Sequence, residues 1–280
     1  MTTTGAAGAT QASRARAFRA LHEREGAFII PNPWDVGTAR LLAHLGFEAL
    51  ATTSAGYAFS VGQCDQTVGR KASLAYASAI ASATNLPVSA DLENGFGDPP
   101  ETVAETVRLA AAAGVVGCSI EDSTRRADHP IYEKQQAMER VRAGAAAARQ
   151  LPFPFTLTAR AENYLHGRPD LRDTIARLQA YQEAGADVLY APGLAAKDDI
   201  AAVVSSVDRP VNVLVGLAGM QLTLVELAAI GVKRLSVGSA LSRIALGAFL
   251  RAAREMREHG SFAFTADAVS SGEINAIFGA

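Results

Sequence analysis

The chain has 280 residues, of which 49% are hydrophobic and 19% are charged, and its formal net charge at pH 7 is −2. This balance suits a soluble protein with a sizeable core and gives no basic field for nucleic acid or an anionic membrane. No apolar run reaches the roughly 18 residues that a membrane span needs, and the first residues contain no apolar signal segment. Cys64 and Cys118 lie far apart and form no disulfide framework, so we expect a cytoplasmic protein in which both are small buried hydrophobes.

The predicted elements begin with a tail of small residues. Residues 1–16 are expected to be flexible, and the run "SRARAFRALHERE" predicts a helix over 13–25. Eight β-rich runs follow and alternate with longer Ala-rich helical runs. The strands are predicted at 27–31, 48–54, 87–92, 116–122, 155–162, 187–192, 210–215 and 233–239. Helical patterns at 36–46, 100–114, 173–185 and 222–231 end in Gly just before the next strand, as helix ends commonly do.

Eight strands that alternate with helices predict parallel pairing and a closed (β/α)8 TIM barrel. An open dinucleotide-binding sheet is disfavoured, because no G-x-G-x-x-G opens a helix after the first strand. Nothing in the chain is typical of a linker, so we predict one domain over 1–280. Residues 240–280 are expected to form a C-terminal helical segment that packs on its own barrel or on a neighbour's.

Charged residues gather where the predicted strands end, which is the edge that carries the active site in such barrels. Asp91 and Glu93 end the third strand, Glu121 ends the fourth, and Asp65 follows the second. Residues i and i+2 of an extended chain point to the same side, so Asp91 and Glu93 repel each other unless a cation joins them. All-oxygen donors suit Mg²⁺ or Mn²⁺. The alternative is that these acids cap helices or pair with arginines.

Arg160 ends the fifth predicted strand, in "FTLTARAE". A planar guanidinium at the barrel mouth can hold a substrate carboxylate with two parallel hydrogen bonds. It can equally neutralise Glu162, Glu121 or another acid at a strand end. The sequence leaves these two interpretations of Arg160 open.

Three segments in order, "ADLENGFG", "SIEDS" and "TARAEN", resemble the isocitrate lyase/phosphoenolpyruvate mutase superfamily. "NPWDVGTARLLAHLGFEALATTSAGYA" and "ARLQAYQEAGADVLYAPG" extend the resemblance over residues 28–258. The resemblance implies a (β/α)8 barrel, often with its last helix exchanged between subunits, in homodimers or homotetramers. It also implies Mg²⁺ or Mn²⁺ and a small 2-oxo or 2-hydroxy acid substrate that reacts through an enolate. The site residues that it implies are Asp91, Glu93, Glu121 and Asp65 for the metal, and Thr53, Ser54, Ala55, Gly56, Arg160 and Asn212 for the substrate.

The segment after the fourth strand departs from the superfamily. Lyases of isocitrate and methylisocitrate carry a K-[KR]-C-G-H loop there, whereas residues 123–136 read "STRRADHPIYEKQQ" and contain no cysteine. We expect this segment to be a mobile lid. His129 within it and Tyr57 are candidate acid–base groups, with solvation and packing as their alternatives. Trp34 is expected to form a wall of the substrate pocket.

The function that these residues predict is a Mg²⁺-dependent carbon–carbon lyase, with Arg160, Glu121, His129 and Tyr57 as its catalytic candidates. Oxaloacetate decarboxylation needs no cysteine in the lid and is the simplest reaction of this class. Cleavage of a methylisocitrate-like hydroxy acid comes next. The alternatives are cleavage of the C–P bond of phosphonopyruvate, and a non-catalytic protein that binds a 2-oxo acid.

Overall fold

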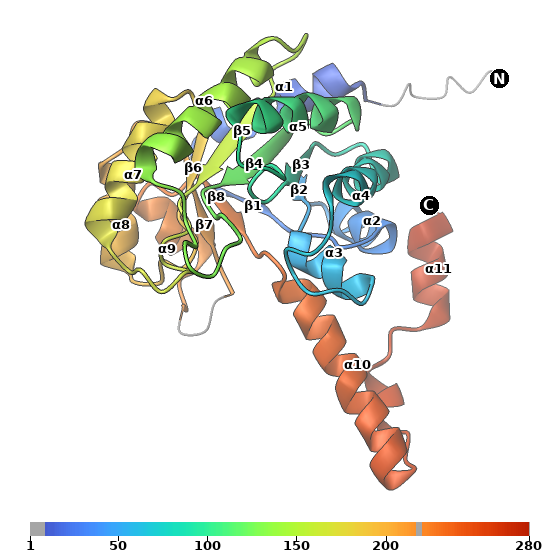
Figure 1. The fold of residues 1–280 in the computed structure, drawn as a ribbon. Helices are drawn as coiled ribbons and strands as arrows, with labels where there is room; N and C mark the ends of the chain where they lie inside the picture. The colour runs from blue at the N-terminus through green and yellow to red at the C-terminus, as the bar shows by residue number, and fades with distance from the viewer. Residues whose placement is uncertain (1–8, 217–219, 280) are drawn as a thin grey trace, which may run out of the picture.

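A single eight-stranded parallel sheet forms the centre of the molecule, and helices surround it (Figure 1). The computed structural model describes residues 9–216 and 220–279. The strands are β1 Phe28–Ile30, β2 Leu50–Ala51, β3 Val88–Asp91, β4 Gly117–Glu121, β5 Thr156–Arg160, β6 Val188–Tyr190, β7 Val211–Leu214 and β8 Arg234–Ser236. Their order in the sheet is β1-β8-β7-β6-β5-β4-β3-β2. Each of the eight predicted strands is found, and the (β/α)8 barrel is confirmed.

The two ends of this sheet, β1 and β2, meet at a seam. Among the described residues, the backbone bond that joins them runs from Ala51 N–H to Pro31 O at 3.0 Å. The buried side chain of Asn32 reinforces the seam, because its Nδ2 donates to Thr52 O at 3.0 Å. Its Oδ1 accepts from the backbone N–H groups of Val237 and Gly238, each at 2.9 Å. One amide therefore fastens the first two strands to the loop after the last.

Helices connect the strands and cover the outside of the barrel (Figure 1). They are α1 Gln11–Glu23, α2 Val36–His44, α3 Ser54–Ser60, α4 Arg70–Ala83, α5 Pro100–Ala112, α6 Lys134–Arg149, α7 Leu171–Glu183, α8 Lys197–Ser205, α9 Leu224–Ala229, α10 Ala240–His259 and α11 Ser271–Gly279, with a 3₁₀ turn at Ala263–Asp267. The four helical patterns that end in Gly are all confirmed. Among the described residues, no helix has the length and apolar character that a membrane span requires.

The N-terminal expectation was partly wrong. Residues 11–16, predicted to be flexible, belong to α1, because the Thr10 hydroxyl accepts from Ser13 N–H and caps the helix there. Residues 1–8 of the expected tail lie outside the described part of the chain. The expected lid, residues 123–136, is also shorter than predicted, since α6 begins at Lys134. The rest of that segment is a turn closed by an antiparallel bridge between Ser123 and Ile131.

The core follows from the strand sequences. Buried parallel strands carry near-continuous apolar runs, and Leu50, Val88, Leu157 and Leu189 are at most 1% exposed. Cys118 is fully buried among them, as predicted. The same prediction was wrong for Cys64, which lies exposed in the loop after α3.

The C-terminal helix α10 leaves the barrel and projects away from it (Figure 1). Ser242 is its one buried residue, and side chains such as Ile244 (68%) and Phe249 (69%) are largely exposed. The chain then returns, and α11 lies against α2, where Arg40 Nη2 donates to Phe278 O. The helix that follows β8 thus does not cover the barrel of its own chain.

Candidate active site

A small cavity opens at the carboxyl ends of the strands, where a TIM barrel carries its active site. Its volume is about 170 Å³. All eight strands, or the segments that follow them, contribute polar side chains to its lining. These are Asn32, Thr52, Thr53, Ser54, Asp65, Ser89, Asp91, Ser119, Arg160, Tyr190, Asn212, Arg234, Ser236 and Ser239. Such a concentration of polar groups inside an apolar barrel marks a functional site rather than a packed core.

Asp91, the last residue of β3, faces this cavity and is held on both oxygens. Its Oδ2 accepts from the backbone N–H of Ser54 at 3.1 Å and from the Ser54 hydroxyl at 2.8 Å. Its Oδ1 accepts from Arg160 Nη1 at 3.1 Å. Since Ser54 is the first residue of α3, the start of this helix fixes the orientation of the carboxylate.

Arg160 lies at the centre of a group of carboxylates. Besides Asp91, its guanidinium contacts Glu121 Oε2 at 3.3 Å and Glu162 Oε1 at 2.8 Å. The parallel register pairs Glu121 with Arg160, which explains this contact. Burial alone would lower the pKa of Arg160, but the carboxylates, Glu162 foremost, outweigh it and hold the pKa above its usual value. The sequence left open whether Arg160 neutralises acids, and in this structure it does.

Glu93 pairs with the turn after β4 instead of facing the cavity. Arg125 Nη2 donates to Glu93 Oε2, and both residues have positive φ values, 50° for Glu93 and 62° for Arg125. Left-handed backbone at non-glycine residues is uncommon and clusters at functional sites. Burial raises the pKa of the Glu93 carboxyl to about 7 despite the nearby Arg125. The positive charge of Arg125 therefore does not offset the cost of burying a charged Glu93 carboxylate.

A divalent cation fits this group in charge and in donor type. Five carboxylates, those of Asp65, Asp91, Glu93, Glu121 and Glu162, interact with two guanidinium groups. Burial, and then mutual repulsion, raise the pKa of Glu121 well above its usual value. In the described part of the chain, however, no three Asp, Glu, His or Cys side chains converge on one point. Asp91 and Asp65 line the cavity and are the acids positioned to meet an ion there, whereas the expected convergence of Asp91, Glu93 and Glu121 is not seen.

Arg234 forms the floor of the cavity and has no carboxylate partner among the described residues. Its guanidinium donates to Asn212 Oδ1 at 2.9 Å and to Thr158 Oγ1 at 3.0 Å, and it lies 3.4 Å from His22 Nε2. Burial lowers the pKa of Arg234 to about 10, so it stays protonated at neutral pH. A buried cation without a counter-ion attracts an anion into the space beside it.

The segment that the resemblance implies for substrate binding, Thr53–Gly56, lies at the start of helix α3. Thr53, Ser54 and Ala55 line the cavity, as does Asn212 from β7. Gly56 lies behind them, and a Cβ there would meet Thr53 Cγ2 at 2.5 Å. Glycine at this position is therefore required by close packing rather than by contact with a ligand.

Besides Gly56, Glu93 and Glu121, three further predicted residues do not line the cavity. The Tyr57 ring stacks on Tyr76 with centroids 4.2 Å apart, so packing, the alternative for this residue, explains it. Trp34 lies outside the lining and packs behind Gly56. His129 is in the turn after β4, with 47% of its side chain exposed and its Nε2 3.9 Å from Glu133. Contact of these three residues with a bound substrate stays a prediction.

Other lining residues were not predicted from the sequence. Arg234 and Tyr190 point into the barrel from the first residue of β8 and the last of β6. The signal for Arg234 is a charge inside an apolar strand, "KRLSV", which has to be either paired or functional. Tyr190 could have been predicted as Arg160 was, because each is a polar residue at the end of a strand.

A family model and several solved structures are similar to this chain. The family model described as phosphoenolpyruvate phosphomutase matches residues 18–257. A structure from Burkholderia cenocepacia J2315, described as a lyase/mutase, is 67% identical, covers 96% of this chain and 97% of its own, and superposes with a TM-score of 0.94. Oxaloacetate acetylhydrolase with its product oxalate is 26% identical over 97% and 95% of the two chains, with a TM-score of 0.86. Phosphonopyruvate hydrolase with oxalate and Mg²⁺ is 26% identical over 96% and 95%, with a TM-score of 0.84.

Proposed function

Since the chain belongs to the phosphoenolpyruvate phosphomutase family, within the isocitrate lyase/phosphoenolpyruvate mutase superfamily, we propose that it is a Mg²⁺-dependent carbon–carbon lyase. Its substrate would be a small 2-oxo or 2-hydroxy dicarboxylic acid, with oxaloacetate as the simplest case. The similarity to oxaloacetate acetylhydrolase, which was solved with oxalate, supports this class of substrate.

One observation carries the proposal: two guanidinium groups, those of Arg160 and Arg234, line the same cavity of about 170 Å³. Arg160 lies beside Asp91 at the mouth, and Arg234 lies on the floor. Guanidinium groups bind carboxylates with paired hydrogen bonds. A space of this size, with a cation at each end, suits a short acid with two carboxylates.

The metal would be held by Asp91, with Asp65, Glu93 and Glu121 around it. When bound, Mg²⁺ supplies a Lewis acid that polarises a carbonyl oxygen and stabilises the negative charge developing on it. The phosphonopyruvate hydrolase structure with oxalate and Mg²⁺ supports this assignment. Burial, and then repulsion from neighbouring carboxylates, raises the pKa of the Glu121 and Asp65 carboxyls, and a bound cation would relieve that repulsion.

The chain's own side chains would bind and orient the substrate. Arg160 would exchange part of its contact with Asp91 and Glu121 for a substrate carboxylate, and Ser54 would offer its N–H and hydroxyl beside it. Tyr190 lies against Arg160, with the guanidinium 5.0 Å from its ring centroid. Burial raises the pKa of Tyr190 to about 12, so it keeps its proton at neutral pH and is the group we assign to hold a proton near the reacting carbon.

The test is an assay of pyruvate release. The purified protein is incubated with Mg²⁺ and oxaloacetate, methylisocitrate or phosphonopyruvate, with and without a chelator. Release from oxaloacetate or methylisocitrate that stops with the chelator supports a metal-dependent carbon–carbon lyase. Release that is indifferent to the chelator for every substrate would contradict the metal-dependent mechanism.

A second candidate is cleavage of a C–P bond, which the similarity to phosphonopyruvate hydrolase favours. Arginine binds phosphonate as well as carboxylate, so the site does not separate the two. Turnover of phosphonopyruvate alone in the same assay would select this reaction. Tight Mg²⁺-dependent binding of a 2-oxo acid without turnover of any substrate would instead select the non-catalytic binder, which the missing lyase loop at residues 123–136 favours.

We also propose that the protein is a homo-oligomer, a dimer or a tetramer, in which α10 packs on a second copy. The helix that follows each strand of such a barrel normally covers the sheet, whereas α10 projects away from it (Figure 1). Its exposed Leu246, Phe249 and Leu250 lie on one side of the helix and form an apolar surface that water solvates poorly. A second barrel with the same uncovered face is the matching partner.

A further inference from the structure

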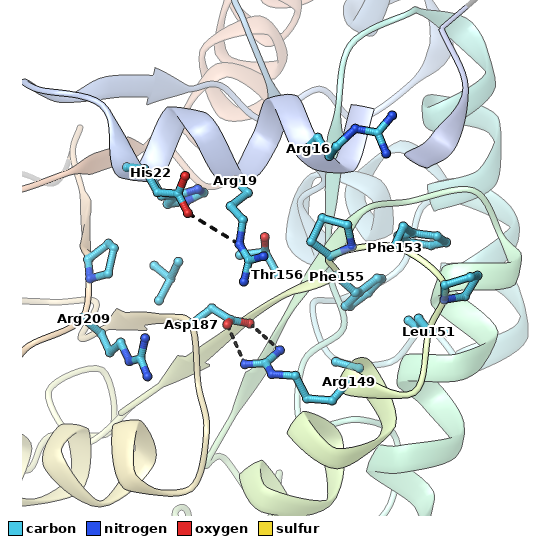
Figure 2. Close-up of a pocket in the computed structure, with 16 residues that line it drawn as sticks. Arg16, Arg19, His22, Arg149, Leu151, Phe153, Phe155, Thr156, Asp187 and Arg209 are labelled. Atoms are coloured by element: carbon cyan, nitrogen blue, oxygen red, sulfur yellow. Dashed lines mark hydrogen bonds and ion pairs between the residues drawn. The ribbon is translucent and has the colours of Figure 1, made fainter. Parts of the chain in front are cut away.

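A second and larger cavity opens at the opposite end of the barrel, where the strands begin. It has a volume of about 910 Å³ and lies between α1, the loop after α6 and the first residues of β5 and β6, Thr156 and Val188 (Figure 2). None of the residues that the sequence or the family implies for catalysis lines it. The lyase chemistry proposed above therefore does not explain it.

Of the residues that the structure describes, four arginines and no lysine line this cavity. Arg16 and Arg19 come from one side of α1, Arg149 ends α6, and Arg209 precedes β7. Figure 2 shows the side chains of Arg19 and Arg149 extending from opposite walls toward the region of Asp187 and Thr156. The chain as a whole has a net charge of −2, so this concentration of positive charge is local.

The two acids of the lining do not cancel the four arginines. Asp187 already accepts from Arg149 Nη2 at 2.6 Å and from Leu157 N–H at 2.8 Å. Glu23 meets Arg19 only at 3.6 Å in an exposed pair, which contributes little. Within the described residues, Arg16 and Arg209 take part in no ion pair.

His22 also lines the cavity and adds no charge to it. Burial, followed by Arg234, lowers the pKa of His22 to about 3, so the ring is neutral at physiological pH. The lining thus has a net excess of two positive charges, from four arginines and two acids. That excess lies on planar guanidinium groups, which match phosphate oxygens in pairs.

The rest of the wall is apolar. Leu151, Pro152, Phe153 and Phe155 line the side formed by the loop after α6, and the two phenylalanine rings lie 6.5 Å apart. Phe153 is half-buried and offers part of its ring to the cavity. An inorganic anion would leave this apolar side unused, whereas a volume near 900 Å³ is at the upper end of sites for small organic ligands.

We propose that this cavity binds a nucleoside di- or triphosphate, with the phosphates on the arginines and the base against the Phe153 side. We name this binding site the arginine cavity, defined by Arg16, Arg19, Arg149, Arg209 and Phe153. The site is independent of the proposed lyase function, because it shares no lining residue with the small cavity.

Isothermal titration calorimetry of the full chain with ATP tests the proposal. The titration is done in EDTA, so that a metal in the active site cannot recruit the phosphates. We expect one ATP per chain, and an increase in Kd of about tenfold for Arg16→Ala and for Arg209→Ala, the typical effect of losing a charged hydrogen bond. Both arginines are exposed, so the variants should keep the melting temperature of the parent protein.

Arg108→Ala is the matched control, since Arg108 is an exposed arginine on α5 that does not line the cavity. Unchanged ATP affinity in Arg16→Ala and Arg209→Ala, or an equal loss of affinity in Arg108→Ala, would overturn the site.

Two further ligands test the proposed contact between the base and the Phe153 side of the cavity. Adenosine should bind weakly, and tripolyphosphate should bind at least tenfold more weakly than ATP; equal affinity for tripolyphosphate and ATP would overturn the role of the apolar wall.

Discussion

Glu121 and Arg160 are register partners in neighbouring strands, and Arg160 Nη2 lies 3.3 Å from Glu121 Oε2. Asp91 meets the same guanidinium at 3.1 Å. An acid that pairs with an arginine of its own chain remains available to a cation only if the arginine can turn to another anion. A substrate carboxylate is such an anion, so we expect binding of metal and substrate to favour each other.

Asp91→Asn should abolish stabilisation by Mg²⁺. A ligand that binds only the folded state at 100 times its Kd adds about 2.7 kcal/mol to the free energy of unfolding, and Asp91 is the acid best placed to hold the ion. Thermal melts with and without Mg²⁺ measure this effect. Asp128→Asn, an exposed acid of the turn after β4, is the control and should respond to Mg²⁺ as the parent does. A full Mg²⁺ response in Asp91→Asn would contradict the metal assignment.

Arg160→Lys should lower kcat/KM at least 100-fold, which corresponds to about 3 kcal/mol. Lysine keeps the positive charge among Asp91, Glu121 and Glu162 and so preserves the fold, but it cannot form two parallel hydrogen bonds with a carboxylate. Steady-state kinetics on the substrate found in the pyruvate assay check this. Arg108→Lys should leave the kinetics unchanged, and a loss of less than threefold in Arg160→Lys would remove Arg160 from substrate binding.

Tyr57→Phe should keep kcat/KM within about threefold of the parent. Phenylalanine can stack on Tyr76 as tyrosine does, and the Tyr57 ring does not line the cavity. The measurement is kcat/KM on the same substrate, with Tyr190→Phe as the comparison, because Tyr190 does line the cavity and should lose considerably more. The reverse order of effects would show that Tyr57 moves to the substrate.

The titration of His22 should lower the free energy of unfolding of the protein in weak acid. Its pKa is about 3 in the folded chain and 6.5 when unperturbed, so the unfolded chain takes up the proton first as pH falls. The contribution of His22 is therefore complete above pH 6.5 and is lost as the pH falls toward 3, by up to about 1.4 kcal/mol per pH unit.

Urea unfolding of the parent and of His22→Gln between pH 7 and pH 4 measures this loss. Glutamine removes the titration, and its side-chain oxygen can still accept from Arg234 Nη1, the group 3.4 Å from His22 Nε2. The free energy of unfolding should fall less steeply in the variant. Parallel curves for the two proteins would mean that His22 does not titrate in this range.

Phe249→Glu should shift the protein toward the monomer. Phe249 is 69% exposed on α10, and a carboxylate there would be buried without a partner in any contact with a second copy. Light scattering after size-exclusion chromatography reports the mass. Arg251→Gln changes the net charge by the same amount on the opposite side of the helix and should leave the assembly intact. A monomeric parent protein would overturn the proposal of an oligomer.

The barrel was predictable because its strands are short apolar runs bounded by turns, as "PVSADL" illustrates for β3. Asp91 and Arg160 were predictable as lining residues because the ends of parallel strands meet at one edge, whereas Ser54 was implied by the resemblance to the superfamily. The sequence could not decide whether Arg160 meets acids or a ligand, since this depends on the register that pairs it with Glu121. Arg234 was missed although its charge inside an apolar strand marks it, because the sequence does not give the side to which the residue points. The packing of Tyr57, one of its two interpretations, could not be decided because its stacking on Tyr76 links separate helices.

Asn32 has a consequence for how the chain is made. Its amide oxygen accepts hydrogen bonds from two backbone N–H groups that lie more than 200 positions later in the sequence, those of Val237 and Gly238. During synthesis on the ribosome, these two hydrogen bonds can therefore form only after almost the entire polypeptide has emerged. A nascent chain that stalls before residue 237 would lack both, so the cavity that Asn32 and Gly238 line can be completed only near the end of translation.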